Sequence, residues 1–325
     1  MKMSRSRKGR LLCVALLLHA AATAFAAWPA DQSIKIIVPQ APGGTNDTVA
    51  RVIGQELAKA LQQTVVVENR AGAAGAIGMQ AVAQAKPDGY TFGLASDSTA
   101  LLDVTRPQLP WKLKRDVRGV GLVGEQPISF AVPAKSPYKS LQEVVAAAKG
   151  KPASISYGTS GTGTSQHLVG EWFARLADIQ TVHIPYKGGG QAATDIASGQ
   201  IPLAVLGLAP MLAQSKAGTV RILALTTPRR SAALPAVPTL TELGYAQIAL
   251  AQWAGLVAPA GTPDAIVKAV SDALVSALAT EPVRQRLLDS GIEPRPLAHQ
   301  DFDRFLRQYI DTWDSVLPGL KLKLD

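Results

Sequence analysis

The stretch IKIIVPQAPGGTNDTVARVIGQELAKALQQTVVVEN, residues 34–69, decides the fold class. Residues 34–39 are a short apolar run rich in β-branched side chains, which predicts a buried strand. A glycine turn follows, and residues 45–61 have the spacing of an amphipathic helix. Residues 64–69 again predict a strand. A strand, a helix and a strand in this order indicate a βαβ unit with parallel strands.

The alternation of strand and helix continues along the chain. Further strands are predicted at residues 90–95, 153–157, 181–185, 201–208 and 220–226. Further helices are predicted at residues 73–83, 140–149, 165–177, 191–198 and 210–217. Repeated βαβ units predict an α/β fold around a largely parallel sheet.

The C-terminal part of the chain is predicted to be helical. Thr262 followed by Pro263 has the pattern of an N-cap and a first helical residue. Ile266, Val270, Leu274 and Leu278 then recur at helical spacing. The last helix carries a stripe that is predicted to be core. That stripe comprises Phe302, Phe305, Leu306, Tyr309, Ile310, Trp313, Val316 and Leu317.

Two apolar, extended stretches, residues 120–133 and 249–259, are predicted to cross between two sheets. A chain that leaves one lobe and later returns builds that lobe from both of its ends. The sequence therefore predicts two lobes, one from residues 27–125 with 250–325 and the other from residues 126–249.

Residues 1–26 have the pattern of a cleaved secretory signal peptide, which predicts export to the periplasm. Basic residues precede an apolar run at residues 11–22, and Ala24-Phe25-Ala26 resembles a cleavage site. The run is shorter than the roughly 20 residues of a membrane span, and an uncleaved anchor is the alternative. The single cysteine, Cys13, lies in this segment, so the mature chain has no thiol.

Charge and motifs exclude several classes of function. The formal net charge of +9 falls to +4 without residues 1–26, and the remaining basic residues are scattered, which disfavours nucleic-acid binding. No dinucleotide or phosphate-loop motif stands at a strand-to-helix turn, so no cofactor is expected. His167, His183 and His299 lack the spacing of metal ligands, so no metal is expected either.

Three turns rich in glycine and hydroxyl groups, residues 39–47, 95–99 and 157–165, each follow a predicted strand. Ligands of open α/β sheets bind outside the carboxyl ends of the strands. Free N–H groups at helix N-termini, approached closely through glycine, suit an anion. Ordinary tight turns with Ser and Thr caps are the alternative. The candidate binding residues in these turns are Gln40, Ala41, Gly43, Gly44, Thr45, Asp47, Ser96, Ser98, Thr159, Ser160, Gly161, Thr162, Gly163, Thr164 and Ser165.

Three further candidates lie close to these turns. Tyr186 follows another predicted strand and could close over a ligand, and Lys187 is either a counter-charge or a solvated surface lysine. His167 starts a helix beside the third turn and is a candidate for ligand contact. A hydrolase that uses Ser160 or Ser165 with His167 is an alternative, although position 162 lacks the glycine of a nucleophile elbow.

Several stretches together resemble the substrate-binding proteins of tripartite tricarboxylate transporters, the Bug-type receptors. They include VVVENRAGAAGAIG (65–78), KPDGYTFGLAS (86–96), ISYGTSGTGTSQHL (155–168) and VHIPYKGGGQAATDIASGQI (182–201). The resemblance covers the mature chain in order. It implies a type II periplasmic-binding-protein fold, with two α/β lobes that close by a hinge on a ligand cleft.

The resemblance also implies a function. It implies a non-enzymatic, monomeric receptor for a small organic carboxylate, held by loop N–H groups, hydroxyls and water without an arginine clamp. The implied partners are the membrane components of a tripartite transporter or, alternatively, a sensor kinase. Two positions depart from the family. Gln40 stands where many family members have an aromatic residue. Gly207, also a candidate binding residue, ends a strand at which many members have an aspartate. The absence of that aspartate favours a simple organic acid over an amino acid as the ligand.

Overall fold

The computed structural model describes residues 28–29 and 32–320, so the predicted signal peptide lies outside the described residues. The decisive βαβ unit is confirmed: β1 (Ile34–Val38) and β2 (Val65–Asn69) flank α2 (Thr45–Leu61). The two strands are parallel, with Ile34 opposite Val65. The helix begins directly after Gly44 because this residue has extended backbone angles.

The other strands and helices largely follow the predicted alternation. The strands are β3 (Thr91–Ser96), β4 (Val117–Pro133), β5 (Ser156–Thr159), β6 (Val182–Pro185), β7 (Leu203–Gly207), β8 (Val220–Leu225), β9 (Ala251–Pro259) and β10 (Glu293–Ala298). The helices are α3 (Ala76–Ala83), α4 (Asp97–Thr105), α5 (Leu113–Asp116), α6 (Leu141–Gly150), α7 (Ser165–Leu176), α8 (Gly189–Ser198), α9 (Leu208–Lys216), α10 (Asp264–Ala279), α11 (Glu281–Asp289) and α12 (His299–Leu320), with short 3₁₀ turns η1 (Ala73–Gly75) and η2 (Ala246–Ile248).

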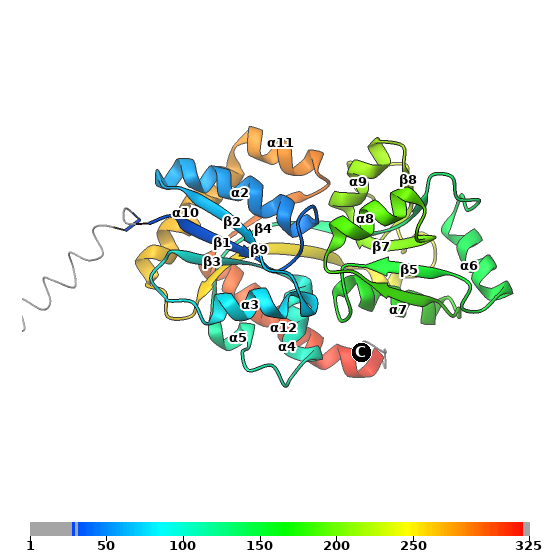
Figure 1. Ribbon diagram of the computed structural model, residues 1–325, viewed down its shortest axis with the longest axis horizontal. Coiled ribbons are helices and arrows are strands. Elements are labelled where there is room, and N and C mark those ends of the chain that lie inside the picture. Colours follow the sequence, from blue (N-terminus) through cyan, green and yellow to red (C-terminus); the bar gives the residue numbers. More distant parts are fainter. Residues whose placement is uncertain (1–27, 30–31, 321–325) are drawn as a thin grey trace, which may run out of the picture.

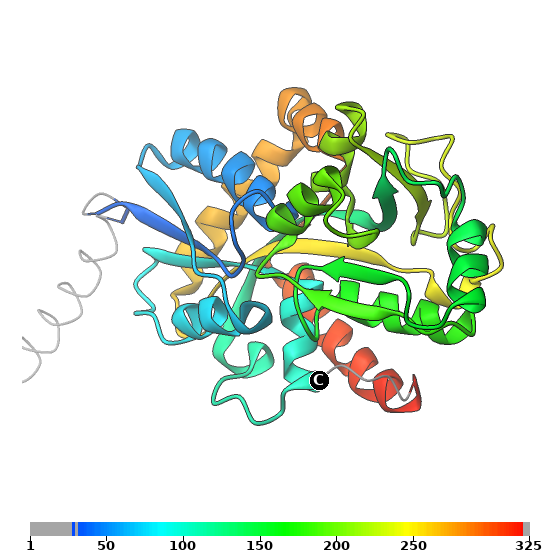
Figure 2. The same ribbon diagram turned by 45° about the vertical axis from the view of Figure 1, so that its right-hand side comes forward.

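Two long strands join the lobes. The strand order is β2-β1-β3-β9-β4-β7-β5-β6, and β8 and β10 also pair with β4. As far as Pro127, β4 pairs antiparallel with β9 in the first lobe, and from Ile128 it pairs with β7 in the second. Figure 1 shows both strands running across the middle of the molecule, and Figure 2 shows β9, in yellow, extending into the second lobe.

Each lobe is a sheet between two layers of helices. In the first lobe, α2 and α10 pack on one face around Ile36 and Leu274, and α3, α4 and α12 cover the other face around Phe302. In the second lobe, α6 and α7 enclose Phe130, and α8 and α9 enclose Leu206. The α/β class and the arrangement in two lobes are thus confirmed (Figure 1).

The predicted C-terminal patterns hold in part. Ile266, Val270, Leu274 and Leu278 are all buried, as expected. The N-cap prediction is wrong, because Pro263 occupies the cap and the buried Thr262 hydroxyl has no hydrogen-bond partner among the described residues.

The apolar stripe of α12 is also less buried than its periodicity suggests. Phe302, Leu306 and Ile310 are buried, and Trp313 and Leu317 are partly buried against the core of the second lobe, whereas Val316 is 41% exposed. Among the described residues, no helix is both long and apolar enough to cross a membrane.

Candidate functional site

A narrow pocket, called here the inner pocket, lies where β4 and β9 pass between the lobes. Its free volume is about 20 Å³, which is room for about one water-sized group. Most of the side chains in its wall are polar, and Val49, Pro210, Trp253, Ala254 and Ile292 add apolar surface. The polar lining residues are Gln40, Thr45, Asn46, Ser96, Asp97, Ser98, Glu125, Gln126, Ser160, Gln166 and Gln252.

A wider pocket, called here the outer pocket, adjoins the inner one, and Gln40 and Ser160 line both. Its free volume is about 290 Å³. Arg106, at the end of α4, and Lys187, after β6, give it positive charge. The remaining lining residues are Gly72, Ala73, Ala74, Gly75, Gly161, Thr162, Pro185 and Tyr186.

Glutamines on the two connecting strands form the floor of the inner pocket. Gln126 on β4 is in register with Gln252 on β9, and Gln126 Nε2 donates to Gln252 Oε1 at 3.2 Å. Gln126 also donates to Thr45 Oγ1 at 2.6 Å and accepts from Ala209 N at 3.0 Å. One side chain therefore links both lobes at the hinge, since Thr45 lies on α2 and Ala209 on α9.

Asp97 brings a buried carboxylate to this network. It begins α4, where a turn was predicted, and it is 1% exposed. Gln252 Nε2 donates to Asp97 Oδ2 at 3.3 Å, and the Ser165 hydroxyl donates to the same carboxylate. Burial raises the pKa of Asp97 to about 6, although these hydrogen bonds oppose the shift.

The third predicted turn is fixed by side chains behind it. Thr159 Oγ1 accepts from Gly161 N at 3.1 Å, and His167 Nδ1 accepts from Gly163 N at 3.1 Å. Thr164 caps α7 by accepting from His167 N. These N–H groups were expected to face an anion, but the protein itself uses them. In contrast, the buried Ser160 hydroxyl has no hydrogen-bond partner among the described residues.

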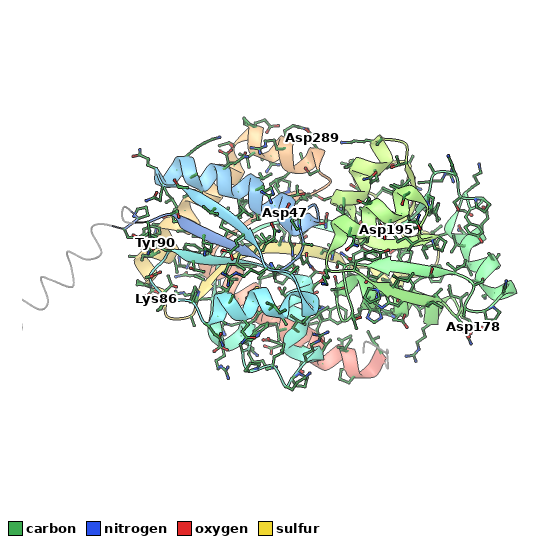
Figure 3. The ribbon with its side chains drawn as sticks, viewed as in Figure 1. Asp47, Lys86, Tyr90, Asp178, Asp195 and Asp289 are labelled. Carbon is green, nitrogen blue, oxygen red and sulfur yellow. The ribbon has the colours of Figure 1, made fainter. Side chains whose placement is uncertain are left out.

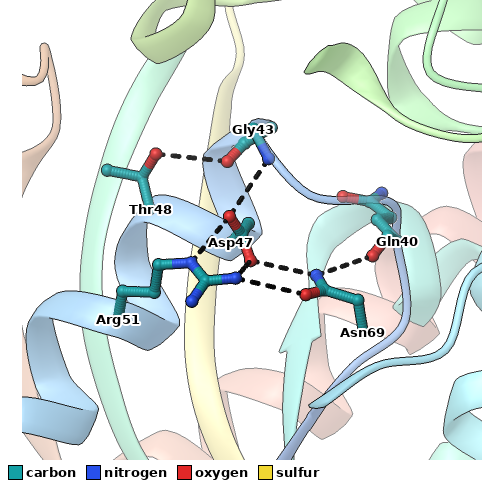
Figure 4. Close-up of polar contacts among 7 residues, drawn as sticks. Gln40, Gly43, Asp47, Thr48, Arg51 and Asn69 are labelled. Atoms are coloured by element: carbon teal, nitrogen blue, oxygen red, sulfur yellow. Dashed lines mark hydrogen bonds and ion pairs between the residues drawn. The ribbon is translucent and has the colours of Figure 1, made fainter. Parts of the chain in front are cut away.

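The first predicted turn is fixed in a similar way (Figure 4). Asp47 accepts from Gly43 N at 3.0 Å, from Asn69 Nδ2 at 3.0 Å and from Arg51 Nε at 2.9 Å. Burial would raise the pKa of Asp47, but the hydrogen bonds from Arg51, Gly43 and Asn69 lower it overall. Asp47 therefore holds the turn and does not line either pocket.

The lobes touch through backbone at the mouth of the cleft. Ala41 N, in the first lobe, donates to Lys187 O, in the second, at 3.1 Å. A Cβ atom on Gly190 would lie 2.4 Å from Pro42 O, so glycine at this position permits the close approach. The two lobes are therefore in direct contact at the mouth of the cleft.

The predicted candidates fall into three groups. Those that line the inner pocket are Gln40, Thr45, Ser96, Ser98, Ser160 and Gly207. Those that line the outer pocket are Gln40, Ser160, Gly161, Thr162, Tyr186 and Lys187. Those that line neither are Ala41, Gly43, Gly44, Asp47, Thr159, Gly163, Thr164, Ser165 and His167. Tyr186 is also tied within the second lobe, because its hydroxyl donates to Asp195 at 2.7 Å; Figure 3 shows Asp195 in that lobe and Asp47 in the other.

Sequence reasoning missed several lining residues, chiefly Asn46, Asp97, Arg106, Gln126, Gln166 and Gln252. The glutamines at 126 and 252 carried a usable signal, because each is a polar residue inside a predicted apolar crossing. Arg106 follows a helix that was not predicted. Its guanidinium donates to Ala73 O at 3.2 Å and to Thr162 O at 3.5 Å, and so joins the two lobes.

Comparison with known proteins agrees with this architecture. The family model of the tripartite tricarboxylate transporter family receptor matches residues 49–322. BugT of Bordetella pertussis is 34% identical over 323 residues, which cover 97% of this chain and 99% of BugT. An R. palustris protein solved with adipate has a TM-score of 0.86 and 28% identity, covering 91% of this chain and 99% of that one. MatC from Rhodopseudomonas palustris, solved with bound malate, has a TM-score of 0.82 and 29% identity, covering 88% and 99%.

Two α/β lobes around a polar cleft define the class of two-lobed solute-binding proteins. More specifically, the chain belongs to the tripartite tricarboxylate transporter receptor family, which includes the Bug proteins.

Proposed function

We propose that the protein is a periplasmic receptor that captures a small organic carboxylate by closing its two lobes and passes it to the membrane components of a tripartite transporter. The outer pocket carries this proposal. Arg106 and Lys187 border it, and neither forms an ion pair with a carboxylate of the described residues. Two unpaired cations beside hydroxyl groups and a glycine turn suit a bound anion.

The relatives support the same ligand class, since structures of two of them contain adipate and malate. Closure is supported by the contacts at the cleft mouth, where the Ala41–Lys187 hydrogen bond and the Arg106 bonds to Ala73 and Thr162 both link the lobes. A ligand between the lobes would add contacts to both and so favour the closed form. We also propose that the lobes comprise residues 27–125 with 250–325 and residues 126–249, and the change of partner of β4 after Pro127 supports this division.

The test is to identify the ligand directly. Mass spectrometry of gently purified protein should detect a retained organic acid. A thermal-shift panel of mono-, di- and tricarboxylates should then raise the Tm in a concentration-dependent way, following RT ln(1 + [L]/Kd). A shift with phosphates, sugars or cations, and none with any organic acid, would contradict the proposed ligand class.

The hydrolase alternative makes a different prediction for Ser160→Ala. A nucleophilic serine needs a base within hydrogen-bond reach. The proposed base is His167, but the Ser160 hydroxyl has no hydrogen-bond partner in the described part of the chain. Ser165 Oγ contacts Ser98 Oγ at 3.1 Å, accepts from Gln252 at 2.9 Å and donates to Asp97, and within the described residues it makes no hydrogen bond to His167. We therefore expect Ser160→Ala to weaken ligand binding, with no ester turnover in either protein. Turnover by the wild type that the variant loses would favour the enzyme.

The cellular partner and location need separate tests. N-terminal sequencing of protein from a periplasmic extract should begin at Ala27 if residues 1–26 are a cleaved signal peptide. Deletion of the transporter's membrane components should abolish uptake of the identified acid while leaving its binding intact. Uptake that persists, together with loss of a transcriptional response to the acid when this protein is removed, would favour partnership with a sensor kinase.

A further inference from the structure

The two pockets differ in charge, and a difference of this kind would orient a ligand that spans both. The inference drawn from it rests on the proposed function. The outer pocket has Arg106 and Lys187, whereas no described residue lining the inner pocket is a lysine, an arginine or a histidine. The inner pocket instead carries Asp97 and Glu125. Glu125 is paired with Arg295, but Asp97 has no cationic partner among the described residues. A ligand carboxylate is thus attracted outward and repelled from the inner end.

The inner pocket is built for a small neutral group. Its free volume of about 20 Å³ suits one water-sized group. Five side-chain amides line it, from Gln40, Asn46, Gln126, Gln166 and Gln252. The N–H groups of Gln126 and Gln252 are already donated within the protein, but Gln126 Oε1 accepts, among the described residues, only from Ala209 N. The pair therefore offers an acceptor, which suits a hydroxyl or the N–H of a carboxamide and not a carboxylate.

Ser160 supplies a second, independent sign of a ligand. Its hydroxyl is without a hydrogen-bond partner among the described residues, and the residue is 3% exposed. It lines both pockets, at the point where they join. A buried hydroxyl without a partner is costly, so a ligand atom at the junction would offset that cost.

Gly207 allows the glutamines to reach the inner pocket. A Cβ at this position would lie 2.3 Å from Gln126 Nε2, 2.6 Å from Gln252 Oε1 and 2.7 Å from Thr45 Oγ1. The backbone of Gly207, at φ −54° and ψ 148°, is accessible to any residue. The glycine is therefore required here for space and not for its backbone angles.

We propose that the ligand is a carboxylate whose far end carries a small neutral hydrogen-bonding group, a hydroxyl or a carboxamide, and that Gly207 determines this specificity by leaving room for Gln126 and Gln252. The carboxylate lies in the outer pocket with Arg106 and Lys187. The neutral end lies against the glutamine pair, and Ser160 bonds the ligand between them.

The first test compares acids that differ only at the far end. The matched pairs are γ-hydroxybutyrate with succinate, ω-hydroxyhexanoate with adipate, and succinamate with succinate, measured by calorimetry on the wild-type protein. We expect at least one neutral-ended acid to bind about tenfold or more tightly than its dicarboxylate partner, because the second carboxylate meets Asp97 without a cation. A dicarboxylate that binds as tightly or more tightly in every pair would overturn the inference and leave the proposed function standing. If no acid of any kind binds, the proposed function itself fails.

The second test uses Gly207→Ala, with Gly150→Ala at the end of α6 as the matched control. A Cβ on Gly150 has no atom within 4 Å, so the control changes the same atoms without displacing a neighbour. We expect Gly207→Ala to lower the affinity for the preferred neutral-ended acid about tenfold. The ratio of its affinity to that of the dicarboxylate should also decrease. An equal loss for both ligands, or no loss for either, would overturn the role of Gly207. Circular dichroism should confirm that both variants fold. If either variant fails to fold, the first test, which uses only the wild-type protein, still decides the inference about the ligand.

Discussion

The imidazole rings of His167 and His183 stack, with centroids 3.8 Å apart and planes 13° apart. His183 Nε2 lies 2.7 Å from Thr159 Oγ1, and His167 Nδ1 accepts from Gly163 N. The pair therefore supports the third turn from behind, without lining either pocket. Burial lowers the pKa of His167 to about 4 and that of His183 to about 3, and the charge of His167 adds to the second shift.

Because burial lowers the pKa of both histidines, we expect the folded protein to lose stability in acid. Both folded pKa values lie below the unfolded value of 6.5, so the unfolded chain binds protons first as the pH falls. Stability due to the pair is complete above pH 6.5 and is lost toward pH 4, by up to about 1.4 kcal/mol per pH unit for each histidine. His183→Gln should reduce the slope of unfolding free energy against pH in this window, measured by urea denaturation. An unchanged slope would contradict this explanation.

For Asp97 we expect the opposite dependence of stability on pH, over a pH range that overlaps that of the histidines. Burial raises its folded pKa to about 6, above the unfolded value of 3.8. The stability that this group contributes is therefore present below pH 3.8 and is lost as the pH rises through 6. Asp97→Asn should remove this loss, so its unfolding free energy relative to the wild type should increase by about 2 kcal/mol between pH 4 and pH 7.

The comparison of Asp97→Asn with the wild type isolates one group, because the two proteins share His167, His183 and Glu171, whose Oε1 lies 3.9 Å from His167 Nε2. Replacing the carboxylate oxygen that accepts from Gln252 has a cost in unfolding free energy that does not depend on pH. This cost therefore shifts the plot of unfolding free energy against pH by the same amount at pH 4 and at pH 7. A difference between the two proteins that stays constant with pH would show that Asp97 does not titrate in this range.

The substitution Gly190→Ala tests how much the close approach of the lobes contributes to ligand affinity. The added methyl group would meet Pro42 O at 2.4 Å and the backbone of Gly43 at 3.0 Å, in the other lobe. Because neither backbone segment can move aside cheaply, we expect the closed form to be disfavoured and the affinity for the ligand to fall tenfold or more, on the order of 1.4 kcal/mol. Stability without ligand should stay level or rise slightly, because alanine favours the helix α8.

Gln191→Ala is the control for closure, since its side chain is exposed on the same helix. Its affinity should match that of the wild type. Small-angle scattering with and without ligand should show compaction for the wild type and Gln191→Ala, and a smaller change for Gly190→Ala. Equal compaction and affinity in all three proteins would show that the glycine contact is unnecessary for closure.

The hydrogen bonds to Asp47 are expected to stabilise the first turn. Its carboxylate, with a side chain 7% exposed, accepts hydrogen bonds from Arg51, Gly43 and Asn69. Asp47→Ala leaves Gly43 N and the Asn69 amide without this acceptor, and we expect a loss of about 2–3 kcal/mol in the free energy of unfolding. Asp47→Asn retains an acceptor oxygen and should lose less. Equal losses would indicate that packing, and not the hydrogen bonds, holds the turn.

Local patterns in the sequence determined the elements of this protein and the loops near its cleft. The β-branched run at residues 34–38 and the apolar spacing of residues 45–61 specify a strand and a helix through interactions within a few residues, and both were predicted closely. The glycine-rich turns follow the strands in sequence, so their place at one end of the sheet could also be deduced.

Only the tertiary structure decided which side chains meet in the cleft. Gln126 and Gln252 are far apart in sequence, and they pair because β4 and β9 adopt one particular register. A register shifted by one residue would direct Gln252 to the opposite face of its strand. The N–H of Gly43 likewise appeared available in the sequence, but Asp47, one helical turn later, accepts from it. Charge and hydrogen bonding at the site depend on such distant pairings, which no local pattern specifies.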